Sequence, residues 1–337
     1  MLEIGSSGII ERETSTADPT QIGSDGFEPA ADLKAGDLVE VRSASDILST
    51  LDAEGKLDGL PFMPEMLAFC GRTFRVSARA DNTCALGQPR RIQATVHLEQ
   101  LRCDGSAHRG CEAGCLLLWK EAWLRRKFDR DDDFSEETAS VDPSNAVYRL
   151  LSNRANQPND TLKCQATELY SATCPVSLGS SAKYFGKIAK DCALRKRGFD
   201  DLRKLIIYFR GKAVLGAFKL WTRAPWNSER FKKTPATPLD LRPGEVVRVR
   251  SMLDILRTLD RKGCNRGMEF KAEMFQFCGR KYQVISNMQR RIDERSGELK
   301  GFKSPCIVLQ SVYCDGQRSF CRRSNYHYWR EIWLSRQ

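Results

Sequence analysis

The sequence lacks the patterns that mark most membrane-spanning, exported and catalytic chains. Its 337 residues contain no apolar run of the roughly 18 residues that a transmembrane helix needs. The N-terminal segment has no basic stretch followed by an apolar one, so it predicts no secretory signal and favours a cytoplasmic location. No phosphate-binding glycine loop, dinucleotide-binding glycine motif, nucleophile-elbow serine or HExxH zinc motif is present. The usual enzyme signatures are missing, and the sequence does not favour an enzyme.

Histidine is scarce as well, which limits thiol catalysis. The chain has three histidines, His97, His108 and His327, and none lies in its middle. A catalytic thiol needs a nearby base. Three interpretations remain for the cysteines in the middle of the chain: a third metal site, a nucleophile or ordinary packing. These cysteines are Cys164, Cys174 and Cys192.

The net charge of +11 is unevenly distributed along the chain. Residues 1–146 carry 16 basic and 26 acidic residues, a net −10, whereas residues 147–337 carry 38 and 17, a net +21. This division predicts either an acidic partner for the second part or docking of the two parts on each other.

Much of the basic charge lies in residues 195–233, which hold 12 basic and 3 acidic residues interleaved with aromatic ones. Apolar residues at helical spacing predict an amphipathic helix here: Leu202, Leu205, Ile206 and Phe209. Its outer face would suit an acidic protein, peptide or carrier protein. Nucleic acid is the alternative partner, because basic charge with aromatic rings can bind phosphates and stack bases. An anionic membrane surface is a further possibility.

An internal duplication organises the rest of the sequence. Residues 33–76 align without a gap on residues 241–284, with 22 identities in 44 positions. Further on, VHLEQLRCDG corresponds to IVLQSVYCDG, and WKEAWLRR corresponds to WREIWLSR. Self-similarity of this extent predicts two structural copies of one module.

Both copies have the same local signals. Each opens with an alternating strand, at Leu38–Val41 and at Val246–Val249. Ser43 and Ser251, each three residues before an aspartate, then predict the N-caps of short helices. The helices are expected over Asp46–Asp52 and Asp254–Asp260. A tryptophan pair ends each copy and is expected to pack in a core: Trp119 with Trp123, and Trp329 with Trp333.

Two stretches of the repeat resemble known proteins. The x-G-D/E-x-V-x-V-R opening, followed by several short strands, resembles a Src-homology-3-like barrel. The longer pattern FCG…CDG…C…W-x-E-x-W-L is similar to an uncharacterised bacterial family of tandem-repeat proteins with cysteine clusters, and the likeness extends to Cys164–Glu168. The resemblance implies a small barrel in each copy and implies no activity.

The predicted fold class is therefore α+β, with two small β-barrel-like, metal-stapled modules on either side of a mainly helical central region. Its expected parts are a disordered arm (1–30), copy one (31–128), an acidic linker (129–144), a basic central region (145–233) and copy two (234–337).

Thirteen cysteines without an export signal indicate metal ligands or reactive thiols rather than disulfides. The alignment matches three cysteines of each copy, and a zinc ion takes four ligands. Cys115 is the nearest fourth ligand in copy one, with Cys84 as the rival. Copy two has Asn325 at the place of Cys115. Cys306 is therefore the predicted fourth ligand of copy two, with His327 as the rival. The eight predicted metal ligands are Cys70, Cys103, Cys111, Cys115, Cys278, Cys306, Cys314 and Cys321.

The expected cofactor is zinc, at two sites, with an iron–sulfur cluster or metal-free buried thiols as alternatives. The Cys-Asp-Gly turns, at Cys103 and Cys314, can direct backbone N–H groups at the sulfur and so favour thiolate. His108 lies in the same loop as Cys103 and could support a ligand or be a spare one.

These patterns favour a metal-stabilised accessory or binding protein whose two modules form a groove for an acidic protein, a peptide or a carrier-linked substrate. Nucleic-acid binding through residues 147–337 is one alternative. A metalloenzyme is the other, with an iron–sulfur redox cluster or an open zinc position, for which copy two is the better candidate. The sequence predicts no oligomeric state.

Overall fold

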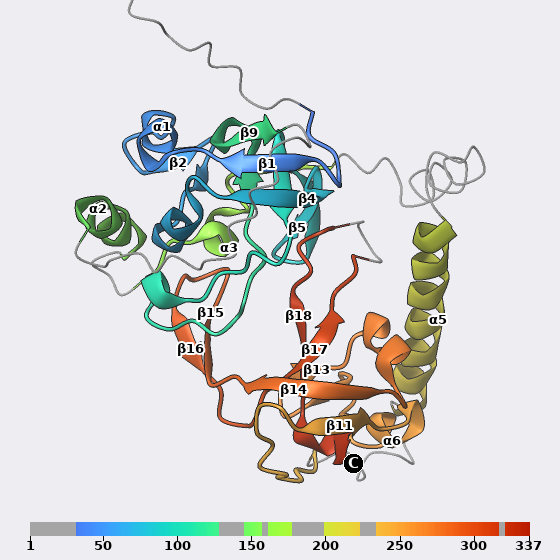
Figure 1. Cartoon of the computed structure of the whole chain (residues 1–337). Helices are drawn as coiled ribbons and strands as arrows, with labels where there is room; N and C mark the ends of the chain where they lie inside the picture. Colours follow the sequence, from blue (N-terminus) through green and yellow to red (C-terminus); the bar gives the residue numbers. More distant parts are fainter. Residues whose placement is uncertain (1–31, 128–144, 157–160, 177–198, 223–233, 317–320) are drawn as a thin grey trace, which may run out of the picture.

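The structure is a computed structural model that describes residues 32–127, 145–156, 161–176, 199–222, 234–316 and 321–337. It mixes helix and strand in several small sheets. The two largest sheets belong to copy one and copy two, and Figure 1 shows them at opposite ends of the molecule. The predicted α+β class is confirmed at this level. The segments predicted to be a disordered arm and an acidic linker lie outside the described residues.

The main sheet of copy one has five antiparallel strands in the order β8-β7-β4-β1-β9. Its strands are β1 (Leu38–Val41), β4 (Thr73–Arg79), β7 (Thr95–Leu98), β8 (Trp119–Lys120) and β9 (Leu124–Lys127). The first four follow one another along the chain, and β9 returns to pair with β1, where Val39 lies opposite both Phe74 and Arg126. The sheet curls into a half-barrel.

Copy two repeats this topology with the order β18-β17-β14-β11-β19. Its strands are β11 (Val246–Val249), β14 (Lys281–Asn287), β17 (Ile307–Tyr313), β18 (Tyr326–Trp329) and β19 (Leu334–Arg336). The two strands predicted to open the copies, Leu38–Val41 and Val246–Val249, are confirmed at the expected bounds. The duplication in sequence is therefore a duplication of fold.

A short capped helix follows the first strand of each copy: α1 (Ala44–Ser49) and α6 (Met252–Leu256). The Ser43 hydroxyl accepts a hydrogen bond from the Asp46 N–H at 3.2 Å, and Ser251 caps α6 in the same way. Both helices begin before the predicted Asp46 and Asp254, directly after their serine caps. They also end earlier than predicted because Asp52 and Asp260 are used elsewhere. Each carboxylate accepts two backbone N–H groups of the turn that follows the helix.

Small elements then complete each copy. They are β2 (Lys56–Leu57), β3 (Leu60–Pro61) and the 3₁₀ helices η1 (Pro64–Phe69), η2 (Ser106–His108) and η3 (Glu121–Trp123) in copy one. Copy two has β12 (Cys264–Asn265), β13 (Met268–Glu269), η5 (Ala272–Phe277) and η6 (Glu331–Trp333).

The tryptophan pairs form the centre of the two cores, as predicted. All four indoles are fully buried. The Phe62 ring packs edge-on against Trp123 with centroids 5.2 Å apart, and Phe270 packs against Trp333 at 5.3 Å. The indole N–H of Trp123 donates to Thr50 at 3.1 Å, which satisfies its one polar atom.

The central region is divided between the two copies. It contains α2 (Ala146–Ala155), α3 (Gln165–Glu168), β10 (Cys174–Pro175) and α5 (Phe199–Thr222). Leu151 and Leu169 belong to the core of copy one, whereas Leu215 and Phe218 of α5 belong to the core of copy two. The predicted helix is confirmed by α5, although Ile206 and Phe209 are about half exposed. Residues 195–198 and 223–233 of the basic stretch lie outside the described part of the chain.

A hairpin leaves each main sheet between its second and third strands. These hairpins are β5 (Asn82–Ala85) with β6 (Gln88–Arg91), and β15 (Arg290–Ile292) with β16 (Leu299–Gly301). In Figure 1 the β15–β16 hairpin of copy two extends to the loops of copy one. Ile292 is buried in the core of copy one, so the two copies share a packed boundary.

None of the described helices has the length and apolar character needed to cross a bilayer.

Candidate metal centre

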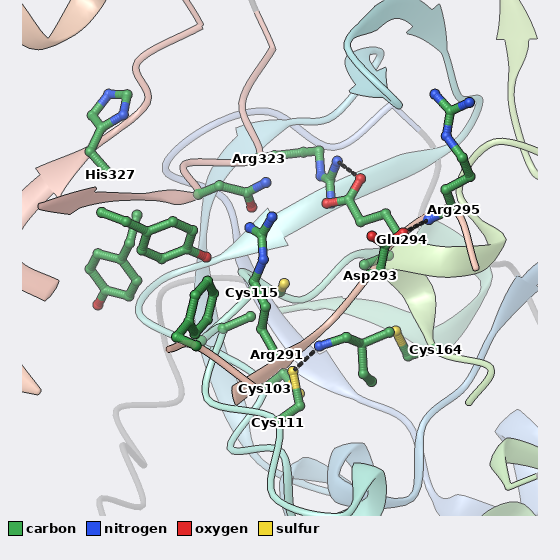
Figure 2. A pocket seen from close by; sticks show the side chains of 18 of the residues that line it. Cys103, Cys111, Cys115, Cys164, Arg291, Asp293, Glu294, Arg295, Arg323 and His327 are labelled. Atoms are coloured by element: carbon green, nitrogen blue, oxygen red, sulfur yellow. Dashed lines mark hydrogen bonds and ion pairs between the residues drawn. The ribbon is translucent and has the colours of Figure 1, made fainter. Parts of the chain in front are cut away.

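A cavity of about 880 Å³ lies between the two copies. Its walls come from both hairpins, from the cysteine-containing loops and from the start of α3, where Cys164 lies (Figure 2). Seven basic and four acidic side chains line it, an excess of three positive charges. Figure 2 shows Arg291, Arg295 and Arg323 among them. The cavity is therefore a basic site that neither copy could form alone.

The boundary beside this cavity has approximate two-fold character. Continuing the repeat alignment places Cys84 of copy one opposite Ile292 of copy two. The Ile292 N–H donates to the Cys111 sulfur at 3.4 Å, whereas the Cys84 sulfur lies 3.4 Å from that of Cys321. Cys111 and Cys321 are themselves equivalent in the repeat. Each hairpin thus contacts the Cys-Asp-Gly loop of the other copy.

Polar contacts fix this arrangement on both sides. The Gln289 N–H donates to the Glu112 carboxylate at 2.6 Å, and Arg290 donates to the Gly110 carbonyl at 3.2 Å. Arg102 of copy one donates to the Ser324 carbonyl of copy two at 3.1 Å, and its guanidinium lies 4.3 Å from the centroid of the Tyr326 ring.

One compact group of potential metal ligands lines the cavity. The ligand atoms of Glu65, Cys103 and His108 all lie within 4.8 Å of one another. Glu65 comes from the first turn of η1, Cys103 from the chain after β7, and His108 from the end of η2. The Glu65 Oε1 and His108 Nδ1 atoms are 3.8 Å apart.

The turn between Cys103 and His108 depends on a glycine. Gly105 has φ 75°, and a Cβ there would overlap the backbone carbonyl of Cys111. Its carbonyl accepts the His108 N–H at 3.0 Å, which folds the histidine back towards the cysteine. Its own N–H points at the Cys103 sulfur and favours the thiolate, as the sequence predicts for this turn.

Burial leaves this group without ordinary partners. Glu65 and His108 are 6% and 1% exposed. Among the described residues, neither carboxylate oxygen and neither ring nitrogen has a hydrogen-bond partner of normal geometry. Burial raises the pKa of Glu65, and burial together with the nearby Glu65 carboxylate raises the pKa of the Cys103 thiol. Both acids are held protonated unless a cation offsets the cost of ionising them.

The other predicted ligands of copy one are not members of this 4.8 Å group, although Cys111 and Cys115 line the same cavity. Cys70 ends η1 at the edge of the core, and burial raises its pKa to about 11. Cys111 contacts the β15–β16 hairpin. Burial also raises the pKa of Cys115 to about 11. Of the four predicted thiols, Cys103 alone joins a compact group, because its loop folds towards η1.

Among the described residues, the predicted ligands of copy two form no group of this kind. Cys306 packs with Met288 and Val308 in a small apolar cluster, and Cys321 lies beside Cys84. Cys278 has the same place at the end of η5 as Cys70 at the end of η1. The described residues contain no second group of three that meets the same 4.8 Å limit.

Copy two nevertheless retains parts of the same chemistry. Glu273 is the repeat equivalent of Glu65, and it contacts Cys314, the equivalent of Cys103. His327, proposed above as a rival ligand, lies 3.9 Å from Glu273 and comes from β18 rather than from the loop. Burial lowers the pKa of His327 to about 3.

Sequence reasoning missed Glu65. Its signal was present, since Glu65 and Glu273 are identical acids followed by Met in both copies, each within an F-x-x-E-M stretch. A carboxylate at a repeated position among core residues is unusual enough to be a candidate ligand. His108 was recognised only as a spare or supporting group.

The cysteines of the central region take separate places. Cys164 is buried against copy one and lines the cavity, and burial raises its pKa to about 12. Cys174 is exposed on β10. Cys192 lies outside the described residues.

Comparison with known proteins adds no assignment: no protein family, no curated protein and no solved structure matches this chain.

Proposed function

We propose that the protein is a zinc-dependent binding protein that accepts an acidic group of its partner in the cavity between the copies. The observation that carries this proposal is the buried Glu65–Cys103–His108 group on the wall of a basic cavity. The partner class is an acidic protein, a peptide or a carrier-linked substrate.

The donor set supports zinc over an iron–sulfur cluster. Thiolate, imidazole and carboxylate are all zinc ligands, whereas iron–sulfur clusters need several cysteines. An unpaired buried polar group costs about 1–3 kcal/mol. A zinc ion would remove this cost for Glu65 and His108 and would stabilise the Cys103 thiolate.

The number of ligands supports a binding role for the ion. Structural zinc is held by four protein ligands, whereas three leave one coordination position for water or another ligand. The group faces the cavity, whose lining carries seven basic and four acidic side chains. A carboxylate or phosphate of the partner would meet both the ion and this positive charge.

The modules themselves are proposed to be Src-homology-3-like barrels that act as rigid supports. The meander of four strands, with a fifth that returns to the first, supports this likeness in both copies. Metal stapling is proposed for copy one alone.

The ligand set is tested by metal analysis of the purified full-length chain. About one zinc ion per chain is expected in the parent protein and in Cys174→Ser, whose thiol is exposed and not part of the group. Glu65→Gln and His108→Gln should retain their far-ultraviolet circular dichroism and lose most of the zinc. Unchanged zinc in both variants contradicts the proposal.

The binding role is tested with a defined acidic probe. Calorimetric titration with a poly-aspartate peptide should give tighter binding to zinc-loaded protein than to chelator-treated protein, and Arg291→Gln should weaken it. Equal affinity with and without zinc contradicts a role for the ion in binding. Binding of duplex DNA that weakens steeply with salt would favour the nucleic-acid alternative instead.

Zinc-dependent hydrolysis is a second candidate, favoured by the three-ligand count. Glu65, Cys103 and His108 would hold the ion, which would supply Lewis-acid activation of water for ester hydrolysis. The zinc-loaded parent should then hydrolyse an activated carboxyl or phosphate ester faster than His108→Gln. Equal rates in the two proteins would exclude this candidate.

A further inference from the structure

We propose that Cys84 and Cys321 are a redox-sensitive modification site, at which a disulfide forms and joins copy one covalently to copy two. The proposal is independent of the zinc site, since neither cysteine belongs to the Glu65–Cys103–His108 group.

The geometry of the two thiols carries the proposal. Their sulfur atoms are 3.4 Å apart, although the residues are 237 positions apart in the chain. The structure describes twelve cysteines, all of them free thiols. Among the described residues no third Cys, His, Asp or Glu completes a compact group with these two. Two thiols in contact without a third ligand favour a dithiol pair over a metal site.

Arg323 prepares one thiol of the pair for reaction. Its guanidinium donates to the Cys84 carbonyl at 2.7 Å and pairs with Glu294 at 2.9 Å, while its backbone N–H donates to the Cys321 sulfur at 3.4 Å. A hydrogen bond from the Cys321 thiol and the positive charge of Arg323 hold the pKa of Cys84 below its usual value. Cys84 is thus the nucleophile and Cys321 the resolving thiol.

The repeat explains why one cross-link forms rather than two. On the other side of the two-fold boundary, Cys111 takes the place of Cys321, but Ile292 takes the place of Cys84. An isoleucine offers no sulfur, so that contact cannot be oxidised. Because Cys84 and Arg323 line the cavity, the cross-link would fix one of its walls.

A hydroperoxide such as hydrogen peroxide is the oxidant. The Cys84 thiolate attacks one peroxide oxygen and the O–O bond breaks, so that Cys84 becomes a sulfenic acid. The other oxygen departs as hydroxide, which takes up a proton to become water. The Cys321 sulfur then attacks the Cys84 sulfur, the S–O bond breaks, and the departing hydroxide leaves as water with the Cys321 proton. Two thiols and one peroxide give one disulfide and two waters.

The test treats the native full-length protein with equimolar hydrogen peroxide. The intact mass should fall by two hydrogen atoms, and peptide mapping should recover a linked Cys84–Cys321 pair. On a non-reducing denaturing gel the looped chain should migrate faster, and dithiothreitol should reverse the shift.

Matched variants complete the test. Cys84→Ser and Cys321→Ser should abolish the gel shift, and Cys174→Ser should leave it unchanged. Mapping of the parent protein decides the matter even if a variant does not fold. A different linked pair in the oxidised parent overturns the proposal, and so does a parent in which Cys84 and Cys321 stay reduced while the exposed Cys174 is oxidised.

Discussion

Copy one and copy two share one frame and differ in what they carry on it. Both have the same strand order, a buried tryptophan pair and a Cys-Asp-Gly turn whose glycine lies against a following cysteine. In copy one that turn brings His108 to Glu65 and Cys103. In copy two the histidine near Glu273 comes from a strand, and no compact group results.

This difference teaches that the scaffold and the site have separate determinants. The frame depends on apolar burial that both copies keep, whereas the site depends on one loop. A buried cation shows the same freedom: Lys120 pairs with Asp58 at 2.8 Å, while its equivalent Arg330 donates to backbone carbonyls such as that of Arg266 at 2.8 Å. The strand order is the same in both copies despite the difference between Lys120 and Arg330.

The largest expected effect tests whether the frames are equivalent. Trp123→Ala and Trp333→Ala each remove a fully buried indole and its hydrogen bond to a threonine. Each should lower the free energy of unfolding by about 3–5 kcal/mol, measured by urea denaturation. Losses that differ by more than about 2 kcal/mol between the copies would break the equivalence.

A matched glycine pair separates frame from site. Gly105 and Gly316 have φ 75° and 71°, and a Cβ on either would overlap a cysteine carbonyl. Gly105→Ala and Gly316→Ala should each cost about 2–3 kcal/mol of unfolding free energy. Only Gly105→Ala should also release zinc, as read by metal analysis after dialysis. If only Gly316→Ala lost zinc, the zinc site would lie in copy two, which would contradict its placement in copy one.

A smaller effect concerns His97, which is Val308 in copy two. Burial lowers the pKa of His97 to about 4. The Leu117 carbonyl, 2.8 Å from its Nδ1, opposes this effect and raises the pKa. The charges of Arg102 and Arg323 lower it further. The unfolded chain therefore binds the proton first, and stability is lost as the pH falls below the unfolded pKa of about 6.5.

His97→Gln sharpens this contrast, since glutamine can still donate to the Leu117 carbonyl. Between pH 7 and pH 5 the parent should lose about 2 kcal/mol more unfolding free energy than the variant. The contribution of His327 is common to both proteins and cancels. An identical pH dependence, measured by denaturant titration at each pH, would show that His97 is not a buried neutral base.

Much of the frame was predictable from the sequence because its signals are local. Alternation placed β1 and β11 at their observed bounds, and Ser43 and Ser251 marked the helix starts. The repeat alignment predicted that the two copies would fold alike. These features depend on residues a few positions apart or on identities between the copies.

The site was less predictable because it depends on which distant segments meet. Cysteines equivalent in the alignment were grouped as ligands, but Cys321 faces Cys84 across the boundary, and Cys306 lies in an apolar cluster. Alignment reports common ancestry rather than proximity. The exchange of hairpins between copies has no signal in composition or spacing, and it determines both the cavity and the thiol pair.

The most direct test of the account compares zinc content in Cys103→Ser and Cys314→Ser, which alter equivalent thiols in the two copies. About one zinc per chain is expected in Cys314→Ser and in the parent, and almost none in Cys103→Ser. Equal zinc in both variants, or loss from Cys314→Ser alone, would contradict it.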